Sequence, residues 1–359
     1  MRNYGLAWKG SKNFIADWVV DNLPSADCFI DLFFGGGAIT HCAMTRNKYK
    51  TYIANDLLDT TSLFIDCVNG AISKDPKYLE WVSREDFERR KTTELWVAIV
   101  YSFGNNCRNY MYSKALEPYK KAVHYAIVYN DFSLLDEYSP LFRDKIKGDT
   151  WQERRLSLRG AFDDKQIIKS TKRLDELDFK YSPKCKQSDL VAEKSEILEF
   201  LKQKYSEGSL ESLESLQRLE SLESLQSLQG NKNLKQFITT QKDYREYNSE
   251  NIPKNSVVYL DPPYYNTNAY TGKDGTKNKF DNKALWAWII ETQNKRPDCL
   301  FVMSEYYTPD DFICVAEKEK RVLMNNTGIQ KGERLKSMER LFVVKGFEKK
   351  IKNMNGFLF

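Results

Sequence analysis

The chain has 359 residues, of which 41% are hydrophobic and 13% aromatic, a composition typical of a globular protein. Because a single core stops growing at about 250 to 300 residues, this length predicts two domains. The net charge of +5 and the pI of 8.6 fit a nucleic-acid partner, but they also fit many ordinary enzymes.

Cysteine and histidine usage narrows the chemistry further. Seven cysteines are scattered along the chain and never form a C-x-x-C pair, which predicts reduced thiols in a cytoplasmic protein without a disulfide frame or zinc. Only His41 and His124 occur, so we expect no metal centre and no histidine-based triad. No apolar run follows the first residues or reaches about 20 residues, so we expect neither a signal peptide nor a membrane span.

The N-terminal segment predicts a loop that leads into a helix. The sequence Trp8-Lys9-Gly10-Ser11-Lys12 precedes apolar residues at helical spacing between Phe14 and Leu23, and Pro24 ends that pattern. Lys12 and the first helical amides are therefore placed to meet an anion. A capped surface helix, with Trp8 covering the core, also fits the pattern.

A strand, a glycine-rich loop and a helix follow. Residues 28–30 read as the strand, Asp31-Leu32-Phe33-Phe34-Gly35-Gly36-Gly37 as the loop and residues 38–45 as the helix. This order is typical of the first unit of a nucleotide-binding α/β fold, although the third glycine of the dinucleotide fingerprint is missing. The next strand, 51–54, ends near Asp56, where an acid can accept the hydroxyls of a ribose.

The middle of the chain begins with helical patterns between residues 76 and 101. They lead into loop 102–112, where amides, an arginine and tyrosines are the groups that read or separate DNA bases; they include Asn105, Asn106, Arg108 and Tyr110. A polar loop with tyrosines packed inward is the alternative. Basic residues beyond the loop suggest phosphate contacts, although a run of solvated charge would give the same pattern; they are Lys114, Lys120, Lys121, Arg143, Lys145, Lys147, Arg154, Arg155 and Arg159.

A low-complexity segment at 209–229 repeats leucine at every third position. Three residues turn an α-helix by about 300°, so these leucines wind around the helix and form no single stripe. We interpret the segment as a tolerated insertion, helical in conformation, at the rim of the middle domain.

Regular α/β order resumes near residue 235. A strand at 235–240 precedes Asp243 and Tyr244, which could cradle the adenine of a nucleoside cofactor. The later elements are predicted as a polar loop at 266–279, a helix at 282–293, a strand at 300–303, a short helix from Asp310 and a final strand at 340–344.

The apolar run 257–260 predicts a strand buried on both faces, and it ends in Asp261-Pro262-Pro263-Tyr264. The prolines stiffen the backbone, the Asp261 carboxylate and the Pro262 carbonyl could bind the two hydrogens of a nucleobase amino group, and Tyr264 offers a flat face to the base. Such a grip aims the nitrogen lone pair outward by positioning and electrostatics. Strands followed by a proline turn are common, so the tetrapeptide is suggestive only in combination with a cofactor site.

Four motifs occur in one order: W-K-G-S-K, D-L-F-F-G-G-G, an acid after the second strand, and D-P-P-Y. In these motifs, and in the Phe-Gly-Asn-Asn-Cys-Arg-Asn-Tyr loop, the chain resembles Dam-type DNA N6-adenine methyltransferases over about residues 4–112 and 235–345. Trp8 stands where tyrosine is also frequent, and the loop differs in detail, so a GATC specificity does not carry over.

The resemblance implies a Rossmann-like α/β sheet of seven strands with an inserted, mostly helical DNA-recognition domain. It places the catalytic, S-adenosylmethionine-binding domain at 1–100 and 231–359 and the recognition domain at 101–230. It also implies that the cofactor is contacted by Trp8, Lys12, Asp31, Phe33, Gly35, Gly37, Asp56 and Asp261, and that the target adenine is held by Asp261 and Tyr264.

The resemblance implies that the substrate is double-stranded DNA and that no metal is required. Transfer to cytosine N4 uses the same amino chemistry and remains an alternative, as does a DNA-binding regulator that keeps the fold without turnover. The sequence leaves open the recognition site, the oligomeric state and whether a cognate restriction endonuclease accompanies the chain.

Overall fold

The computed structural model describes residues 4–114, 117–138, 140–161, 236–265, 270–271, 277–278, 280–321 and 336–354. Contacts divide the chain into two compact units, residues 1–71 with 225–359 and residues 72–224. This division differs from the predicted limits at 100 and 231, and the functions assigned to the two parts stay predictions. The leucine segment at 209–229 lies outside the described residues, as does most of the loop predicted at 266–279.

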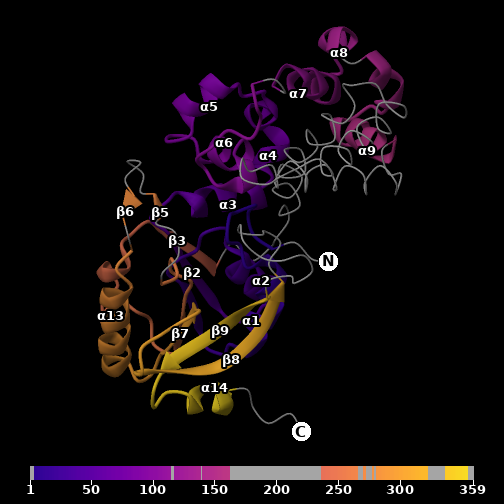
Figure 1. Cartoon of the computed structure of the whole chain (residues 1–359). Helices are drawn as coiled ribbons and strands as arrows, with labels where there is room; N and C mark the ends of the chain where they lie inside the picture. Colours follow the sequence, from indigo (N-terminus) through magenta and orange to yellow (C-terminus); the bar gives the residue numbers. More distant parts are fainter. Residues whose placement is uncertain are drawn as a thin grey trace. The chain divides into compact units, whose positions relative to one another are not determined.

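The first unit is built on one seven-stranded sheet (Figure 1). In spatial order its strands are β3 (Phe237–Thr240), β2 (Thr51–Asn55), β1 (Cys28–Asp31), β4 (Ser256–Leu260), β7 (Leu300–Glu305), β9 (Lys336–Val344) and β8 (Phe312–Arg321). The strands from β3 to β7 are parallel, and β9 runs antiparallel to both β7 and β8. The predicted α/β fold with seven strands is confirmed.

The order of the strands reverses between β1 and β4. From β1 the chain adds β2 and then β3 on one side, and it later returns to place β4 and β7 on the other. In open α/β sheets, ligands bind beside the carboxyl ends of the strands at such a reversal. Asp31 ends β1 and Asp261 follows β4, so both lie at this point of the sheet.

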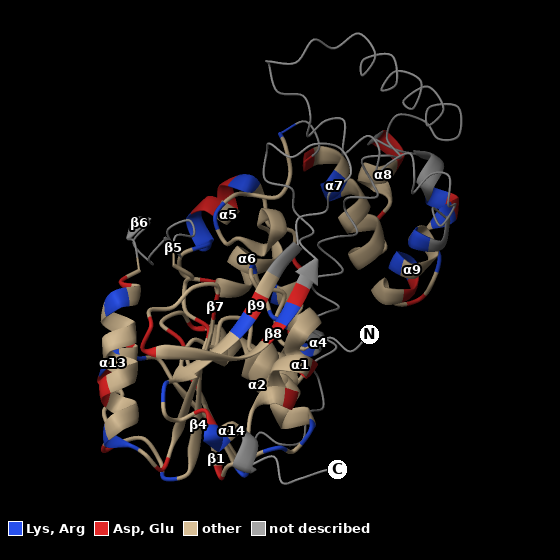
Figure 2. Cartoon of the chain, turned by 60° about the horizontal axis from the view of Figure 1, so that its bottom comes forward, with Lys and Arg blue, Asp and Glu red and all other residues tan. Residues whose placement is uncertain are grey.

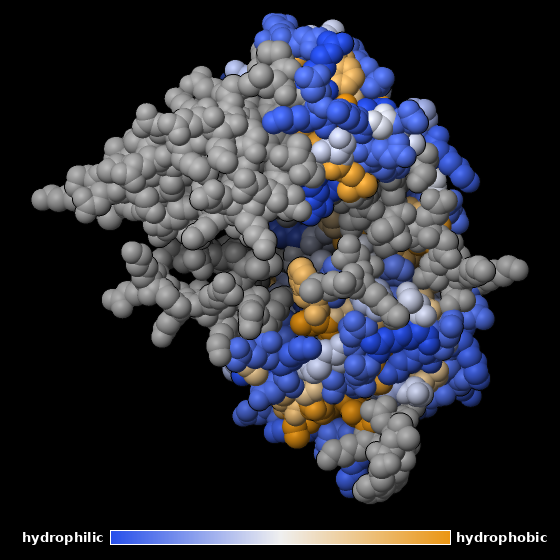
Figure 3. Space-filling view, turned by 90° about the vertical axis from the view of Figure 1, so that its right-hand side faces the viewer, coloured by the Kyte–Doolittle hydropathy of each residue, from blue (hydrophilic) through white to orange (hydrophobic). Residues whose placement is uncertain are grey.

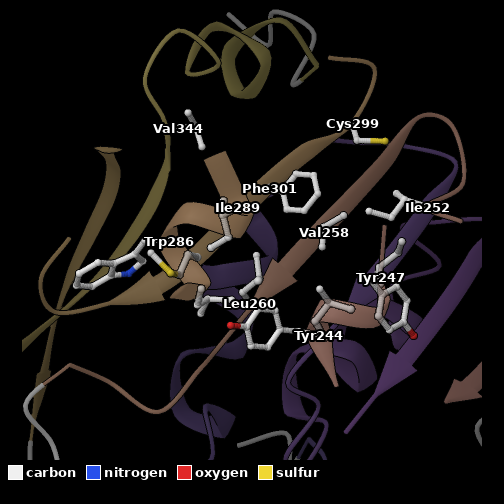
Figure 4. Packing of buried hydrophobic residues seen from close by; sticks show 14 of the residues in the cluster. Tyr244, Tyr247, Ile252, Val258, Leu260, Trp286, Ile289, Cys299, Phe301 and Val344 are labelled. Atoms are coloured by element: carbon white, nitrogen blue, oxygen red, sulfur yellow. The ribbon is translucent and has the colours of Figure 1, made fainter. Parts of the chain in front are cut away.

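Helices cover the two faces of the sheet, with α13 (Asn282–Lys295) on one side and α1 (Ala16–Asn22) and α2 (Ala38–Thr45) on the other (Figure 1). Alternate residues of the central strands point toward α13, among them Val258 and Phe301, and they form a buried cluster with Trp286 and Ile289 of that helix (Figure 4). Full burial of one such side chain contributes about 1.5–3 kcal/mol, so this packing fixes the strand ends that carry the acids.

The remaining elements of this unit are short. They are η1 (Asn13–Ile15), α3 (Thr60–Val68), η7 (Tyr244–Glu246), α14 (Lys349–Met354) and an antiparallel pair of β5 (Tyr270–Thr271) and β6 (Lys277–Asn278).

The predicted helix from Asp310 is wrong, because residues 312–321 form strand β8 at the edge of the sheet. The second half of β8, residues 317–321, consists of alternating Glu and Lys followed by Arg, and these residues favour a helix locally. The pairing of β8 with β9 overrides that preference. Charged side chains on an edge strand also discourage pairing with other chains, which explains the polar character of β8.

The described part of the second unit consists of helices and connecting loops. Its elements are η2 (Pro76–Leu79), α5 (Arg84–Arg90), α6 (Leu95–Val100), η3 (Phe103–Asn105), α7 (Glu117–His124), the π-helix η4 (Tyr125–Tyr129), α8 (Ser133–Tyr138), η5 (Pro140–Lys145) and α9 (Trp151–Ala161), preceded by α4 (Ala71–Lys74) at the boundary. In neither unit does a described helix reach the length and apolar character needed to cross a bilayer.

Candidate active site

The loop between β1 and α2 requires glycine at two of its positions. Gly35 and Gly37 have φ angles of +50° and +71°, and a Cβ atom on Gly37 would lie only 2.1 Å from the ring of Phe34. Trp8 packs on the same loop, since a Cβ atom on Gly36 would lie 2.7 Å from the Trp8 Cβ. The structure thus brings the first two sequence motifs into contact at the carboxyl end of β1.

Asp56 closes the other side of this loop. One carboxylate oxygen accepts a hydrogen bond of 2.7 Å from the Gly35 amide, and the other accepts one of 2.8 Å from the Leu58 amide. Burial raises the pKa of Asp56, while these two amides oppose the change. Each oxygen keeps lone-pair capacity for a further donor, as a ribose hydroxyl would require.

Aromatic rings gather beside the glycine loop. The ring centroids of Phe33 and Tyr244 are 5.9 Å apart, and Phe280 lies 5.8 Å from Phe33 and 6.1 Å from Tyr244. Asp243 caps η7 through the Arg245 amide and pairs with the Arg245 side chain at 2.8 Å. Asp243 therefore holds the turn that presents Tyr244 to the other rings.

Asp31 is a buried carboxyl group at the end of β1, only 2% exposed. Thr40 donates a 2.6 Å hydrogen bond to Oδ2, whereas Oδ1 finds no partner among the described residues. Burial raises the pKa of Asp31 to about 7; the Thr40 hydrogen bond opposes the change, and the charges of Asp261 and Asp56 add to it. A ligand that brings a cation to Oδ1 would offset the cost of ionising this group.

Lys12 joins the N-terminal motif to D-P-P-Y. Its Nζ lies 2.9 Å from Asp261 Oδ1 and 3.6 Å from Glu339 Oε1, and it sits 4.7 Å from the centroid of the Tyr264 ring. Burial alone would lower the pKa of Lys12, but the carboxylates of Asp261 and Glu339 outweigh it, so the pKa is raised and the ammonium stays charged. The predicted residues Lys12, Asp261 and Tyr264 thus lie in one cluster.

The turn after Asp261 is anchored from several sides. The Asn282 side chain donates to the Pro263 carbonyl at 2.8 Å, and the Tyr264 hydroxyl donates to Glu339. Pro262 is buried between these anchors. Within the described residues, no group of three or more His, Cys, Asp or Glu side chains is arranged to hold a metal ion.

A family model of D12 class N6 adenine-specific DNA methyltransferases matches residues 8–137. The match covers 130 of the 359 residues, and over this part the chain is similar to that family. A search of curated proteins finds no match. The matched segment contains the N-terminal motif, the glycine loop, Asp56 and loop 102–112, whereas Asp261 lies beyond its end.

This match supports an enzyme that methylates N6 of adenine in DNA. Methyltransferases of this family generally use S-adenosylmethionine, and DNA is the substrate. The Dam-type subgroup, the residues that bind the cofactor and the residues that bind DNA stay predictions.

The methyltransferase carries loop 102–112 in its second unit, where the loop uses several of its own side chains to hold its shape. The Asn105 side chain donates to the Ile99 carbonyl at 3.0 Å, and Asn106 Oδ1 accepts from the amides of Arg108 and Asn109. Tyr110 is buried, with its hydroxyl on the Val82 carbonyl, so its ring belongs to the core of this unit.

Other side chains of the same loop face solvent. Arg108 is exposed, and so is Phe103, at 60%. Sequence reasoning did not select Phe103, although a phenylalanine in a polar loop is a signal for a wedge between bases. On the face drawn in Figure 3, the described part of the surface is mainly hydrophilic, with apolar side chains in small areas.

Three of the predicted phosphate contacts are wrong, because Lys120, Arg154 and Arg155 are buried. Arg154 donates to the carbonyls of Ile127, Gly148 and Asp149, so it ties segments of the second unit together. Helices α5 and α9 carry charges of both signs and no uniform basic stripe (Figure 2).

Two further acids of the sheet were not predicted from the sequence. Glu305 at the end of β7 is fully buried and accepts hydrogen bonds from the amides of Tyr265, Tyr306 and Tyr307. Glu339 in β9 is fully buried as well. Glu339 is spaced at a period of two with Leu341 and Val343, so it lies on the buried face of the strand. This spacing is the pattern in the sequence that could have identified Glu339.

Proposed function

We propose that this edge of the sheet binds S-adenosylmethionine and an adenine rotated out of DNA, and that Asp261 directs methyl transfer to its N6. The observation that carries the proposal is a difference between the two oxygens of the Asp261 carboxylate. Lys12 holds Oδ1 at 2.9 Å, while Oδ2 has no hydrogen-bond partner among the described residues and the side chain is 20% exposed. A fixed carboxylate with one oxygen available suits an incoming amino group.

The residues of the first unit fit the parts of the cofactor. Asp56 would accept the ribose hydroxyls, Phe33 and Tyr244 would contact the adenine ring, and the glycine loop under Trp8 would admit the ligand close to the backbone. Asp31 Oδ1, buried and without a partner in the described part of the chain, would accept from the ammonium of the methionyl group. When bound, S-adenosylmethionine supplies an electrophilic methyl group on a cationic sulfur.

The target amine would be gripped by two acceptors. Asp261 accepts one amino hydrogen and the Pro262 carbonyl accepts the other, so the nitrogen lone pair is directed away from the base plane. Tyr264 provides a ring against the base. As the nitrogen gains the methyl carbon, the bond from that carbon to sulfur would break and the sulfur would leave as a neutral thioether; the nitrogen then loses one proton, for which the Asp261 carboxylate is the adjacent acceptor.

DNA would be engaged by loop 102–112 of the second unit. Arg108 offers an exposed guanidinium to phosphate or a base edge, and the exposed Phe103 offers an apolar wedge. Asn105 and Asn106 would support this role by keeping the loop in its left-handed turns, in which Gly104 and Asn105 have φ angles of 59° and 54°.

The test is the substitution Asp261→Ala, with the exposed Asp310→Ala as its control. Unmethylated plasmid DNA is incubated with S-adenosylmethionine, digested to nucleosides and analysed by mass spectrometry. We expect N6-methyladenosine from the wild type and from Asp310→Ala, and about a 10²- to 10³-fold lower rate from Asp261→Ala with DNA binding retained. Equal rates in all three proteins would refute the role of Asp261.

A further inference from the structure

Glu339 stands out because it is a carboxylate on an apolar face. It lies on β9 between β7 and β8, and it shares its face of the strand with Leu341 and Val343, all three being 0% exposed. Burying a carboxylate is costly unless cations or hydrogen-bond donors compensate it. The partners of Glu339 therefore indicate why an acid occupies this position.

These partners belong to the candidate active site. The Tyr264 hydroxyl donates a hydrogen bond to Glu339 Oε1, and the same oxygen lies 3.6 Å from Lys12 Nζ. Lys12 Nζ is also 2.9 Å from Asp261 Oδ1, so one ammonium is shared by two carboxylates. The Tyr264 ring is held from a second direction by the edge of Tyr306, with centroids 4.6 Å apart.

We propose that Glu339 is a positioning residue for methyl transfer, acting through Tyr264 and Lys12. This inference rests on the proposed function of Asp261. Glu339 fixes the Tyr264 ring by its hydroxyl, so that the ring is already oriented when a base arrives. It also draws the Lys12 ammonium to a second carboxylate, which leaves Asp261 more able to accept a hydrogen from the target amine.

The protonation of the pair supports this arrangement. Burial raises the pKa of the Tyr264 hydroxyl well above its ordinary value, and the charges of Asp261 and Glu339 add to the effect. The hydroxyl therefore remains a donor across the physiological pH range. A phenol that always donates can serve as a permanent tether between the D-P-P-Y turn and β9.

The experiment compares Glu339→Gln, Tyr264→Phe and the double variant, with Glu317→Gln as the matched control. Glu317 lies on the neighbouring strand β8, where it is exposed and pairs with Arg340 at 3.3 Å. Single-turnover methylation of unmethylated plasmid DNA is measured with tritiated S-adenosylmethionine. Cofactor affinity is measured by calorimetry, and folding by the thermal melting temperature.

We expect Glu339→Gln and Tyr264→Phe each to lower the single-turnover rate by about 10- to 100-fold, the range of a lost hydrogen bond to a charged group. Cofactor affinity should change by less than about threefold, because neither change removes a side chain that is proposed to contact the cofactor. Glu339→Gln removes only the second carboxylate beside Lys12. The double variant should be no slower than the slower single variant, since both changes break one link. Glu317→Gln should stay within about twofold of the wild type.

Several outcomes would overturn the proposal. Tyr264→Phe leaves Glu339 in place. If its rate stays within about twofold of the wild type, the proposal is overturned, even if Glu339→Gln fails to fold. Multiplying effects in the double variant, or equal losses of rate and cofactor affinity, would indicate a structural role only. Asp261→Ala is measured alongside: if it loses transfer while Glu339→Gln does not, the proposed function stands and the inference about Glu339 fails.

Discussion

Replacing Asp31 by asparagine should change how the stability of the cofactor-free protein depends on pH. The native carboxyl group has a pKa of about 7, whereas the ordinary value is 3.8. The native state therefore holds this proton more tightly than the unfolded chain does. Stability is highest below the unfolded pKa and is lost as the pH rises through the folded pKa.

The magnitude follows from the two pKa values. A difference of about 3 in pKa corresponds to about 4 kcal/mol at alkaline pH, of which about 1.7 kcal/mol is already lost at pH 5 because the unfolded carboxyl is ionised there. Between pH 5 and pH 8 the wild type should thus lose about 2.5 kcal/mol that Asp31→Asn keeps. Any fixed cost of burying the amide cancels, because only the change with pH is compared.

The assay is urea unfolding followed by circular dichroism at pH 5, 6, 7 and 8 for the wild type, Asp31→Asn and Asp27→Asn. The exposed Asp27 has its pKa lowered by its hydrogen bonds with Lys50 and Asn255, so it stays ionised in both states over this range. The difference between Asp27→Asn and the wild type should therefore not vary with pH. The same flat difference for Asp31→Asn would refute the buried, proton-binding state of Asp31.

Three further predictions concern the cofactor, the glycine loop and DNA. By calorimetry, the affinity of the wild type for S-adenosylmethionine should rise by up to about 90-fold from pH 5 to pH 8, because the ionised fraction of Asp31 rises from about 1% to about 90%, and Asp31→Asn should show no such rise. Gly37→Ala should lower the free energy of unfolding by more than Gly346→Ala does. Gly346 also has a positive φ (+92°), but nothing lies within 4 Å of the added methyl group. Equal losses of the free energy of unfolding would contradict the clash with Phe34. Arg108→Ala should weaken DNA binding in fluorescence anisotropy. If Arg108 contacts a phosphate, the slope of log affinity against log salt concentration should also fall in magnitude by about 1. Arg89→Ala on α5 should leave the affinity and the slope unchanged.

Local patterns were sufficient for the elements that carry the cofactor motifs. The helix at 38–45 was predicted with its observed limits, and the strands at 28–30 and 257–260 lie within β1 and β4. In each case the apolar run and the residues that end it are adjacent in sequence. Glycines with positive φ and the acids after the strands then follow from the same short segments.

Long-range partners decided the features that the sequence did not predict. The charged half of β8 becomes a strand only because β9 pairs with it. The sequence of loop 102–112 left both a DNA-binding and an inward-packed Tyr110 open, and in the structure Tyr110 packs on Tyr101 and Phe87 of the second unit. Glu339 reaches Lys12 from the opposite end of the chain, a relation that no local pattern contains.

The acids at the carboxyl edge of the sheet explain why stability and function should oppose each other in this methyltransferase. Asp261 and Glu339 share the buried ammonium of Lys12, and the charges of Asp261 and Asp56 act on the nearby Asp31. Carboxylates in such surroundings repel one another and lose hydration, which is the reason that Asp31 retains a proton near neutral pH. A ligand with an ammonium and a sulfonium group would supply the missing positive charge. Asp31→Asn should therefore reduce the loss of stability of the empty protein as the pH rises while weakening its hold on the cofactor.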